Sequence, residues 1–210
     1  MVRNDFAISN GATGKDPKLW FGTLHENKAP SSDYYQMWFV KRDDIDLYIK
    51  SNFEEDLNRA AEGKLKSWED APRGILALII LLDQFSRNIY RGTAKAFAQD
   101  NLALQLCLQG IEKGADKNLH PVERLFFYMP LEHSEDLEMQ KKSVEYFSLL
   151  EKLFTSAPSL ASMISTFRDY ADKHFVIIER FGRFPHRNDI LGRESTPVEI
   201  EFLKEPGSSF

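Results

Sequence analysis

An uninterrupted apolar run from Ile75 to Leu82, which reads Ile-Leu-Ala-Leu-Ile-Ile-Leu-Leu, most constrains the fold of this chain. We expect it to belong to a helix from Pro72 to about Asn88. The segment opens with a proline suited to a first helical turn, and it is too long for a typical strand. A helix that is apolar on every side must be surrounded by protein. The sequence therefore predicts one central, fully buried helix.

Other helices are predicted around this central one from 3.6-residue apolar periodicity and from capping residues. They span Asp43–Glu62, Thr93–Lys113, Pro121 to about Tyr128 (interrupted by Pro130), Leu137–Phe154, Leu160–Phe181 and a last short helix from a capping box at Thr196 to about Lys204. Alternating strand patterns are absent from the sequence, and short loops favour antiparallel helical hairpins. We expect an all-α fold with one domain over residues 17–210, preceded by a loose polar arm at residues 1–16.

Charge and cysteine content narrow the classes of function. The formal net charge is −5 and the isoelectric point is about 5.6, whereas non-specific binding to nucleic acid or to an anionic membrane needs a basic surface. The single cysteine, Cys107, lies among leucines in a predicted helix and excludes an internal disulfide. The N-terminal residues do not have the pattern of a secretory signal. We expect a cytoplasmic protein that binds neither nucleic acid nor membrane.

A first polar segment follows the apolar run directly. Asp83 and Arg87 lie four residues apart, so their side chains can pair along one face of the helix. An ionised aspartate placed directly after eight apolar residues needs such a partner, because an unpaired buried carboxylate is costly. Two interpretations stay open at this stage, a salt-bridged helix end and a pair that contacts a ligand.

A second polar segment, Tyr128-Met-Pro-Leu-Glu-His-Ser-Glu-Asp, surrounds the break expected at Pro130. Glu132, His133 and Glu135 are possible metal ligands. However, neither the paired Glu-x-x-His motifs of di-iron bundles nor the His-Glu-x-x-His zinc motif occurs. Helix capping and ion pairing explain these residues more simply, so neither a metal nor a cofactor is predicted.

A third polar segment, from His174 to Thr196, is rich in arginine although the protein is acidic. It contains four of the twelve arginines and two of the five histidines, namely Arg180, Arg183, Arg187, Arg193, His174 and His186. Several guanidinium groups that converge make a site for carboxylate or phosphate. The alternative is internal, with these arginines neutralising Asp83, Glu132, Glu135 and Glu179 and fastening the tail to the body.

Together these segments resemble a bacterial family catalogued as domain of unknown function 924. The resemblance rests on Leu82-Asp-Gln-Phe-Ser-Arg-Asn, Tyr128-Met-Pro-Leu-Glu-His-Ser-Glu-Asp, Arg180-Phe-Gly-Arg-Phe-Pro-His-Arg-Asn and Leu191-Gly-Arg-Glu-Ser-Thr, and Trp38-Phe39, Trp68 and Arg91-Gly-Thr also fit. It covers about Leu19 to Leu203. It implies an all-helical, tetratricopeptide-like fold of helical hairpins. It carries no established activity, substrate or catalytic residue.

Our preferred hypothesis is a binding protein with a polar cleft for an anionic small ligand or an acidic peptide. The residues expected to contact the ligand are Arg180, Arg183, His186, Arg187, Asp83, Arg87, Tyr128 and His133. One alternative is an enzyme with His133 or His174 as general base beside Glu132 or Glu135, in hydrolytic or metal-assisted chemistry. Another is a structural or interaction protein whose polar segments only lock the fold. The sequence does not indicate the ligand or the oligomeric state.

Overall fold

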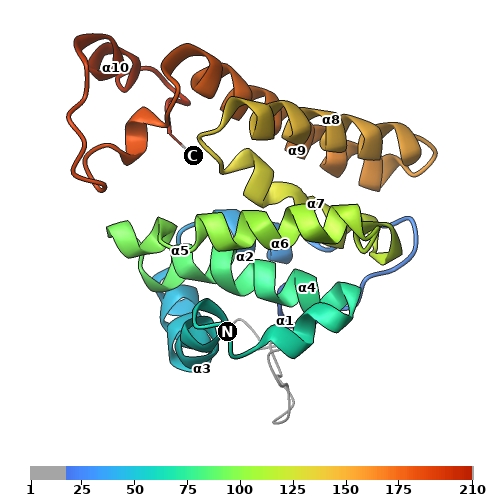
Figure 1. Cartoon of the computed structure of the whole chain (residues 1–210). Helices are drawn as coiled ribbons and strands as arrows, with labels where there is room; N and C mark the ends of the chain where they lie inside the picture. The colour runs from blue at the N-terminus through green and yellow to red at the C-terminus, as the bar shows by residue number, and fades with distance from the viewer. Residues whose placement is uncertain (1–17, 210) are drawn as a thin grey trace, which may run out of the picture.

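A computed structural model describes residues 18–209, and its regular elements are all helical (Figure 1). The loose arm predicted at residues 1–16 lies outside the described residues. The α-helices are α1 (Lys18–Phe21), α2 (Ser32–Phe39), α3 (Asp43–Ala61), α4 (Pro72–Ile79), α5 (Ser86–Ile89), α6 (Asp100–Glu112), α7 (Pro121–Glu132), α8 (Leu137–Leu153), α9 (Pro158–Phe181) and α10 (Pro197–Phe202). The all-α class is confirmed, and no helix among residues 18–209 has the length and apolar character needed to cross a membrane.

The central buried helix is also confirmed, but its hydrogen bonding changes along its length. It begins as α4, passes through a π-helical turn at Ile80–Phe85 and continues as α5, so that the helical path runs from Pro72 to Ile89. Every residue from Gly74 to Ser86 is buried. The wide turn is the part of this helix that apolar periodicity cannot predict, because it depends on local hydrogen bonds.

Helix α7 packs against α4 and α6 on one side and against α8 and α9 on the other. In Figure 1 it crosses between the α8–α9 hairpin and the N-terminal helices. The prediction that Pro130 interrupts this helix was wrong, because α7 continues to Glu132 with the proline inside it. A proline near the end of a helix leaves only one backbone carbonyl without its donor. This extra length carries Glu132 and His133 to the end of α7.

The helix predicted at Thr93–Lys113 begins later than expected. Residues Ala94–Phe97 form a 3₁₀ turn, and α6 starts at Asp100. Its end agrees with the prediction, since Gly114 adopts a left-handed conformation with φ of 68°. The late start places Asp100 in the first helical turn, where a carboxylate is favoured by the helix dipole.

An aromatic cluster surrounds Phe126 of α7 in the core. Trp20, Phe21 and Trp38 are buried and contact its ring, with centroid distances of 5.9, 5.2 and 4.7 Å. Aromatic pairs at these separations add to the burial of their surface. The aromatic N-terminal segment therefore covers the core, and Cys107 is buried as well.

Helices α8 and α9 form an antiparallel hairpin, and the C-terminal segment folds back over its end (Figure 1). A small second apolar cluster of Ile177, Ile178, Phe184 and Phe202 fixes this segment to α9. The capping box predicted at Thr196 is present, with Thr196 and Glu199 bonding reciprocally at the start of α10. A tetratricopeptide-like arrangement of the hairpins stays a prediction.

Candidate functional site

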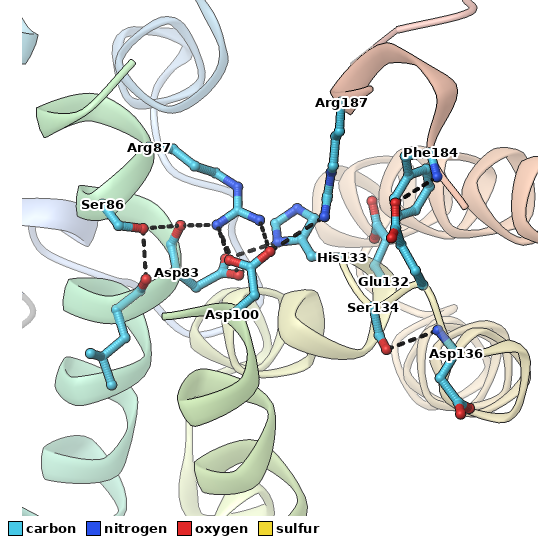
Figure 2. Close-up of polar contacts among 12 residues, drawn as sticks. Asp83, Ser86, Arg87, Asp100, Glu132, His133, Ser134, Asp136, Phe184 and Arg187 are labelled. Carbon is cyan, nitrogen blue, oxygen red and sulfur yellow. Dashed lines mark hydrogen bonds and ion pairs between the residues drawn. The ribbon is translucent and has the colours of Figure 1, made fainter. Parts of the chain in front are cut away.

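The π-helical turn at Ile80–Phe85 is the part of the central helix that contributes to the site. Side chains from the next turn bind the carbonyl groups in this stretch: the hydroxyl of Ser86 donates to the carbonyl oxygens of Leu82 (2.6 Å) and Asp83 (3.2 Å), and Arg87 also donates to that of Asp83. Figure 2 shows these contacts. Single π turns inside α-helices are frequent at functional sites. These hydrogen bonds thus stabilise the distorted turn, which places Asp83 at the end of the buried helix.

The carboxylate of Asp83 is completely buried and contacts three side chains. Nδ1 of His133, at the end of α7, lies 2.8 and 3.0 Å from its two oxygens, and the amide of Gln84 donates to Oδ2 at 2.6 Å. Arg87 lies 3.3 Å from Oδ1. Burial raises the pKa of Asp83, but Arg87 and His133 more than offset this and hold it well below its ordinary value. Burial lowers the pKa of His133, so we infer an ionised aspartate beside a neutral histidine.

A second carboxylate, Asp100 of α6, joins two arginines that are far apart in sequence. Arg87 donates to both of its oxygens at 3.0 Å, and Arg187 donates to Oδ2 at 3.4 Å (Figure 2). The guanidinium of Arg187 also lies over the rings of Phe97 and Phe184, at 4.7 and 4.5 Å from their centroids. Burial lowers the pKa of Arg187 to about 10, so the group stays charged at neutral pH.

A cavity of about 260 Å³ lies beside these groups. Its polar lining includes His133, Asp100 and Arg187, and the remaining lining residues are Ala94, Phe97, Ala98, Asn101, Leu104, Pro130, Ser134, Glu135 and Leu191. An apolar surface with a few convergent polar groups is the usual composition of a small-molecule site. The cavity lies where α6, the end of α7 and the C-terminal segment meet.

Behind His133, Glu132 and His174 form a second buried pair. Nδ1 of His174 lies 3.1 Å from Oε1 of Glu132 and 2.8 Å from the backbone carbonyl of Tyr170. Burial first, and the charge of Asp83 second, raise the pKa of Glu132 to about 8. Burial also lowers the pKa of His174 well below its ordinary value. The pair is therefore uncharged at neutral pH unless a cation is bound.

Glu135 holds the C-terminal segment over the cavity. Arg193 donates to both of its oxygens at 2.6 and 2.9 Å, and the backbone N–H of Phe184 donates to Oε1 at 2.8 Å. Arg193 also donates to the carbonyl of Phe184 at 3.1 Å. Because Phe184 carries one of the rings under Arg187, these bonds fix the position of the arginine that borders the cavity.

The eight residues predicted to contact a ligand separate into two groups. His133 and Arg187 line the cavity, and Asp83 and Arg87 lie behind this lining, where Asp83 contacts His133 and Arg87 binds Asp100. His186 lies beside them, with its ring 5.5 Å from that of Phe184, and burial and Arg187 lower its pKa to about 4. The remaining three residues lie elsewhere.

Arg183, Arg180 and Tyr128 are separate from this cavity. Arg183 binds Glu199 through two hydrogen bonds of 2.6 and 2.7 Å. Arg180 is exposed and stacks on Phe181, 4.7 Å from the ring centroid. Tyr128 is buried in the core, where its hydroxyl donates to Asp116 at 2.6 Å. Arg193 binds Glu135, as the internal alternative expected, whereas Arg183 binds Glu199, a carboxylate that this alternative did not name.

The bond between Arg183 and Glu199 gives a test of this tail anchor. We expect Glu199→Gln to lower the free energy of unfolding at pH 7 by about 1–2 kcal/mol, as loss of a capping group does. Hydrogen bonds from Arg183 and Thr196 lower the pKa of Glu199 to about 2. The carboxylate therefore stabilises the fold above about pH 4.5, and its contribution disappears as the pH falls towards 2.

Urea unfolding of wild type and Glu199→Gln at pH 7 and pH 3 measures this effect. The difference should be clearly smaller at pH 3. Glu201→Gln, which removes an exposed carboxylate from the same helix, should match wild type at both pH values. Equal losses at pH 7 and pH 3 would show that the charge of Glu199 does not matter.

Sequence reasoning missed several residues that border the cavity. Asp100, which binds Arg87 and Arg187, was expected inside a helix that begins at Thr93. No residue pattern in the sequence marked the later start of α6. Phe97 and Leu191 are ordinary apolar residues in sequence. The pairing of His133 with Asp83 spans fifty positions, and no local spacing indicates it.

Comparisons with known proteins agree with this fold and add no activity. Residues 17–207 match the model of a family described as bacterial protein of unknown function (DUF924). A solved structure of a protein of unknown function, ATU0120 from Agrobacterium tumefaciens, is 37% identical, with a TM-score of 0.72, over 80% of this chain and 89% of that one. No curated protein matches the chain.

Proposed function

The chain belongs to the DUF924 family of bacterial proteins of unknown function, and we propose that it binds a small anionic molecule in the cavity beside Arg187. The expected ligand is a compact carboxylate or phosphate compound. Arg187 would supply its charge, and His133 would contact it from the end of α7. Phe97, Leu104 and Leu191 would cover the apolar part of the ligand.

The incomplete pairing of Arg187 carries this proposal. Arg193 and Arg183 each bind a carboxylate through two short bonds. By contrast, Arg187 makes a single long bond of 3.4 Å to Asp100; its Nε has no hydrogen-bond partner among residues 18–209, which is also true of the Nε of Arg193. Two aromatic rings hold its guanidinium in place instead. A fixed guanidinium with unused donors beside a cavity is suited to an anion.

The size of the cavity favours a small molecule over an acidic peptide. Sites for drug-sized ligands usually enclose about 300–1,000 Å³, and this cavity of about 260 Å³ is smaller. Asp100 and Glu135 also border it, but each is already bound to another arginine, Arg87 and Arg193 respectively. An anion beside Arg187 would therefore meet carboxylates that are engaged in ion pairs.

Thermal unfolding in the presence of inorganic phosphate, a phosphomonoester and a short dicarboxylate tests the proposal. A ligand at about 100 times its dissociation constant adds about 2.7 kcal/mol. For a chain of this length that corresponds to a rise in Tm of about 5–10 °C. We expect such a rise with at least one of these anions in wild type, and none with Arg187→Met.

Arg183→Met is the matched control, because it removes an arginine from the same segment that already binds a carboxylate. Its own Tm should fall, while the rise caused by the anion should remain. An unchanged response in Arg187→Met would refute the proposal, as would a wild-type protein that responds to none of the three anions. Loss of stability in Arg187→Met with no anion response in wild type would favour the purely structural alternative.

An enzyme is the second candidate, and the contact between Asp83 and His133 favours it. A carboxylate on Nδ1 of a histidine fixes that proton and leaves Nε2 with its lone pair. This arrangement is shared by general-base histidines and by histidines that bind metals. Asp83, rather than the Glu132 or Glu135 considered from sequence, is the carboxylate bonded to His133.

A cytoplasmic location stays our expectation. The only cysteine is reduced and buried, which suits a reducing compartment. The net charge of −5 gives no support to binding of nucleic acid or an anionic membrane.

A further inference from the structure

Three buried side chains at the end of α7 and on α9 have the chemistry of a metal site. One carboxylate oxygen of Glu132 and one ring nitrogen each of His133 and His174 lie within 4.8 Å of one another. Two ligand atoms about 2.1 Å from a tetrahedral zinc ion lie about 3.4 Å apart. Small side-chain rotations would therefore bring all three around one ion.

Both histidines are held by partners of the kind that surround metal ligands. His133 contacts the carboxylate of Asp83 through Nδ1, and His174 donates from Nδ1 to the backbone carbonyl of Tyr170, at 2.8 Å in each case. Histidines that bind metals almost always donate their other ring N–H to a carboxylate or a backbone carbonyl. These contacts fix the tautomer of each ring before any ion arrives.

Among Asp83, Asp100, Glu132 and Glu135, only Glu132 has no arginine partner in the part of the chain that the structure describes. Asp83, Asp100 and Glu135 each pair with at least one guanidinium. Glu132 contacts His174, and its Oε2 is buried with no hydrogen-bond partner among the described residues. A buried carboxylate oxygen without a partner is costly, and a bound cation would satisfy it. Because Gln140 donates to its backbone carbonyl at 2.6 Å, the end of α7 that carries Glu132 is held in place.

We propose that Glu132, His133 and His174 bind a divalent transition-metal ion of the zinc class. Two imidazoles and one carboxylate are a known ligand set for zinc sites that keep a further position open. His133 belongs to both the metal cluster and the cavity lining, so the ion would lie at the inner end of the cavity. The proposal goes beyond the anion pocket and does not depend on it.

A cation here would also strengthen the binding of an anion. Three carboxylates near the cavity are matched by Arg87, Arg187 and Arg193. A divalent ion on an ionised Glu132 adds one net positive charge, which a ligand anion could neutralise. Binding of the cation and binding of the anion would then strengthen each other.

Calorimetric titration of the full-length, chelator-treated protein with Zn²⁺ tests the proposal. We expect about one equivalent to bind, and Co²⁺ in its place should give visible absorption typical of a four- or five-coordinate ion. In wild-type protein labelled with ¹⁵N, Zn²⁺ should shift the ring resonances of His133 and His174. It should leave those of His25 and His120 unchanged.

Glu132→Gln is the informative variant, because it keeps the shape of the side chain but cannot form the carboxylate that a cation would bind. Changes in the shell around a metal typically cost 10–100-fold in affinity, so loss of a ligand should cost about 100-fold or more. His25→Gln removes an exposed histidine and controls for binding at the surface. It should bind Zn²⁺ as wild type does.

Two results would overturn the metal site. One is a wild-type protein that binds no Zn²⁺ at micromolar concentration. The other is Zn²⁺ binding without shifts of the His133 and His174 resonances, an outcome that does not depend on whether Glu132→Gln folds. The anion response in thermal unfolding is measured separately in metal-free protein, so failure of either proposal leaves the other recognisable.

Discussion

Asp83→Asn is expected to lower the free energy of unfolding at pH 7 by about 3–5 kcal/mol, the usual cost of breaking a buried ion pair by removing one partner. The carboxylate of Asp83 accepts bonds from Gln84 and His133 and lies beside Arg87. Asparagine offers one oxygen and one donor group. At least one of these donors would then face another donor in a site that water cannot reach.

Urea unfolding monitored by circular dichroism measures this loss, and the slope of the transition should not change, since the surface exposed on unfolding is the same. Asp44→Asn is the control, because Asp44 pairs with Arg42 at an exposed position. That substitution should have no measurable effect. If both variants were equally stable, the contacts of Asp83 would not contribute to the fold.

The sequence predicted the central helix well, because its signal is thermodynamic and local. Eight consecutive apolar residues from Ile75 to Leu82 can avoid water only inside the protein. The π turn at Ile80–Phe85 could not be predicted in the same way. It depends on bonds from Ser86 and Arg87 to main-chain carbonyls, and Ser and Arg residues four positions after a carbonyl are common in ordinary helices.

Helix ends were predicted less well than helix positions. Pro130 is an acceptable residue in the last turn of α7, and packing on both sides of that helix outweighs one lost bond. Thr93 has the residue type of an N-cap, but its side chain donates to the carbonyl of Tyr90 instead. Tertiary contacts decide which of the possible local hydrogen bonds forms at a helix end, and these contacts cannot be read from the sequence.

The candidate site was predicted in part. Charge alone indicates that buried acidic and basic side chains must pair, but it does not indicate which residues form each pair. An aspartate after an apolar run requires a partner, and Arg87 and His133 provide it. Arginines in the C-terminal segment require carboxylates, yet the spacing of Arg183 and Arg187 gave no reason to separate them. Only the folded chain shows Arg183 bound to Glu199 while Arg187 lies beside the cavity.

The core and the site occupy different parts of α7, and this separation can be tested. Phe126→Ala is expected to lower the free energy of unfolding by about 3–5 kcal/mol, the usual cost of removing a buried phenylalanine. The ring of Phe126 is completely buried and contacts five aromatic rings: Trp20, Phe21, Trp38, Phe39 and Phe167. Glu132 and His133 lie almost two turns further along the helix, beside α9 and the central helix.

At 15 °C, where the variant should still be mostly folded, Phe126→Ala should therefore bind Zn²⁺ and respond to anions as wild type does. Urea unfolding, zinc titration and the thermal response to phosphate, measured on one preparation, separate the two effects. Phe39→Ala is the matched control, because this ring belongs to the same cluster but is 43% exposed, and it should cost clearly less. Loss of zinc and anion binding in folded Phe126→Ala would mean that the aromatic core, rather than the polar contacts of Asp83 and Glu135, positions the end of α7.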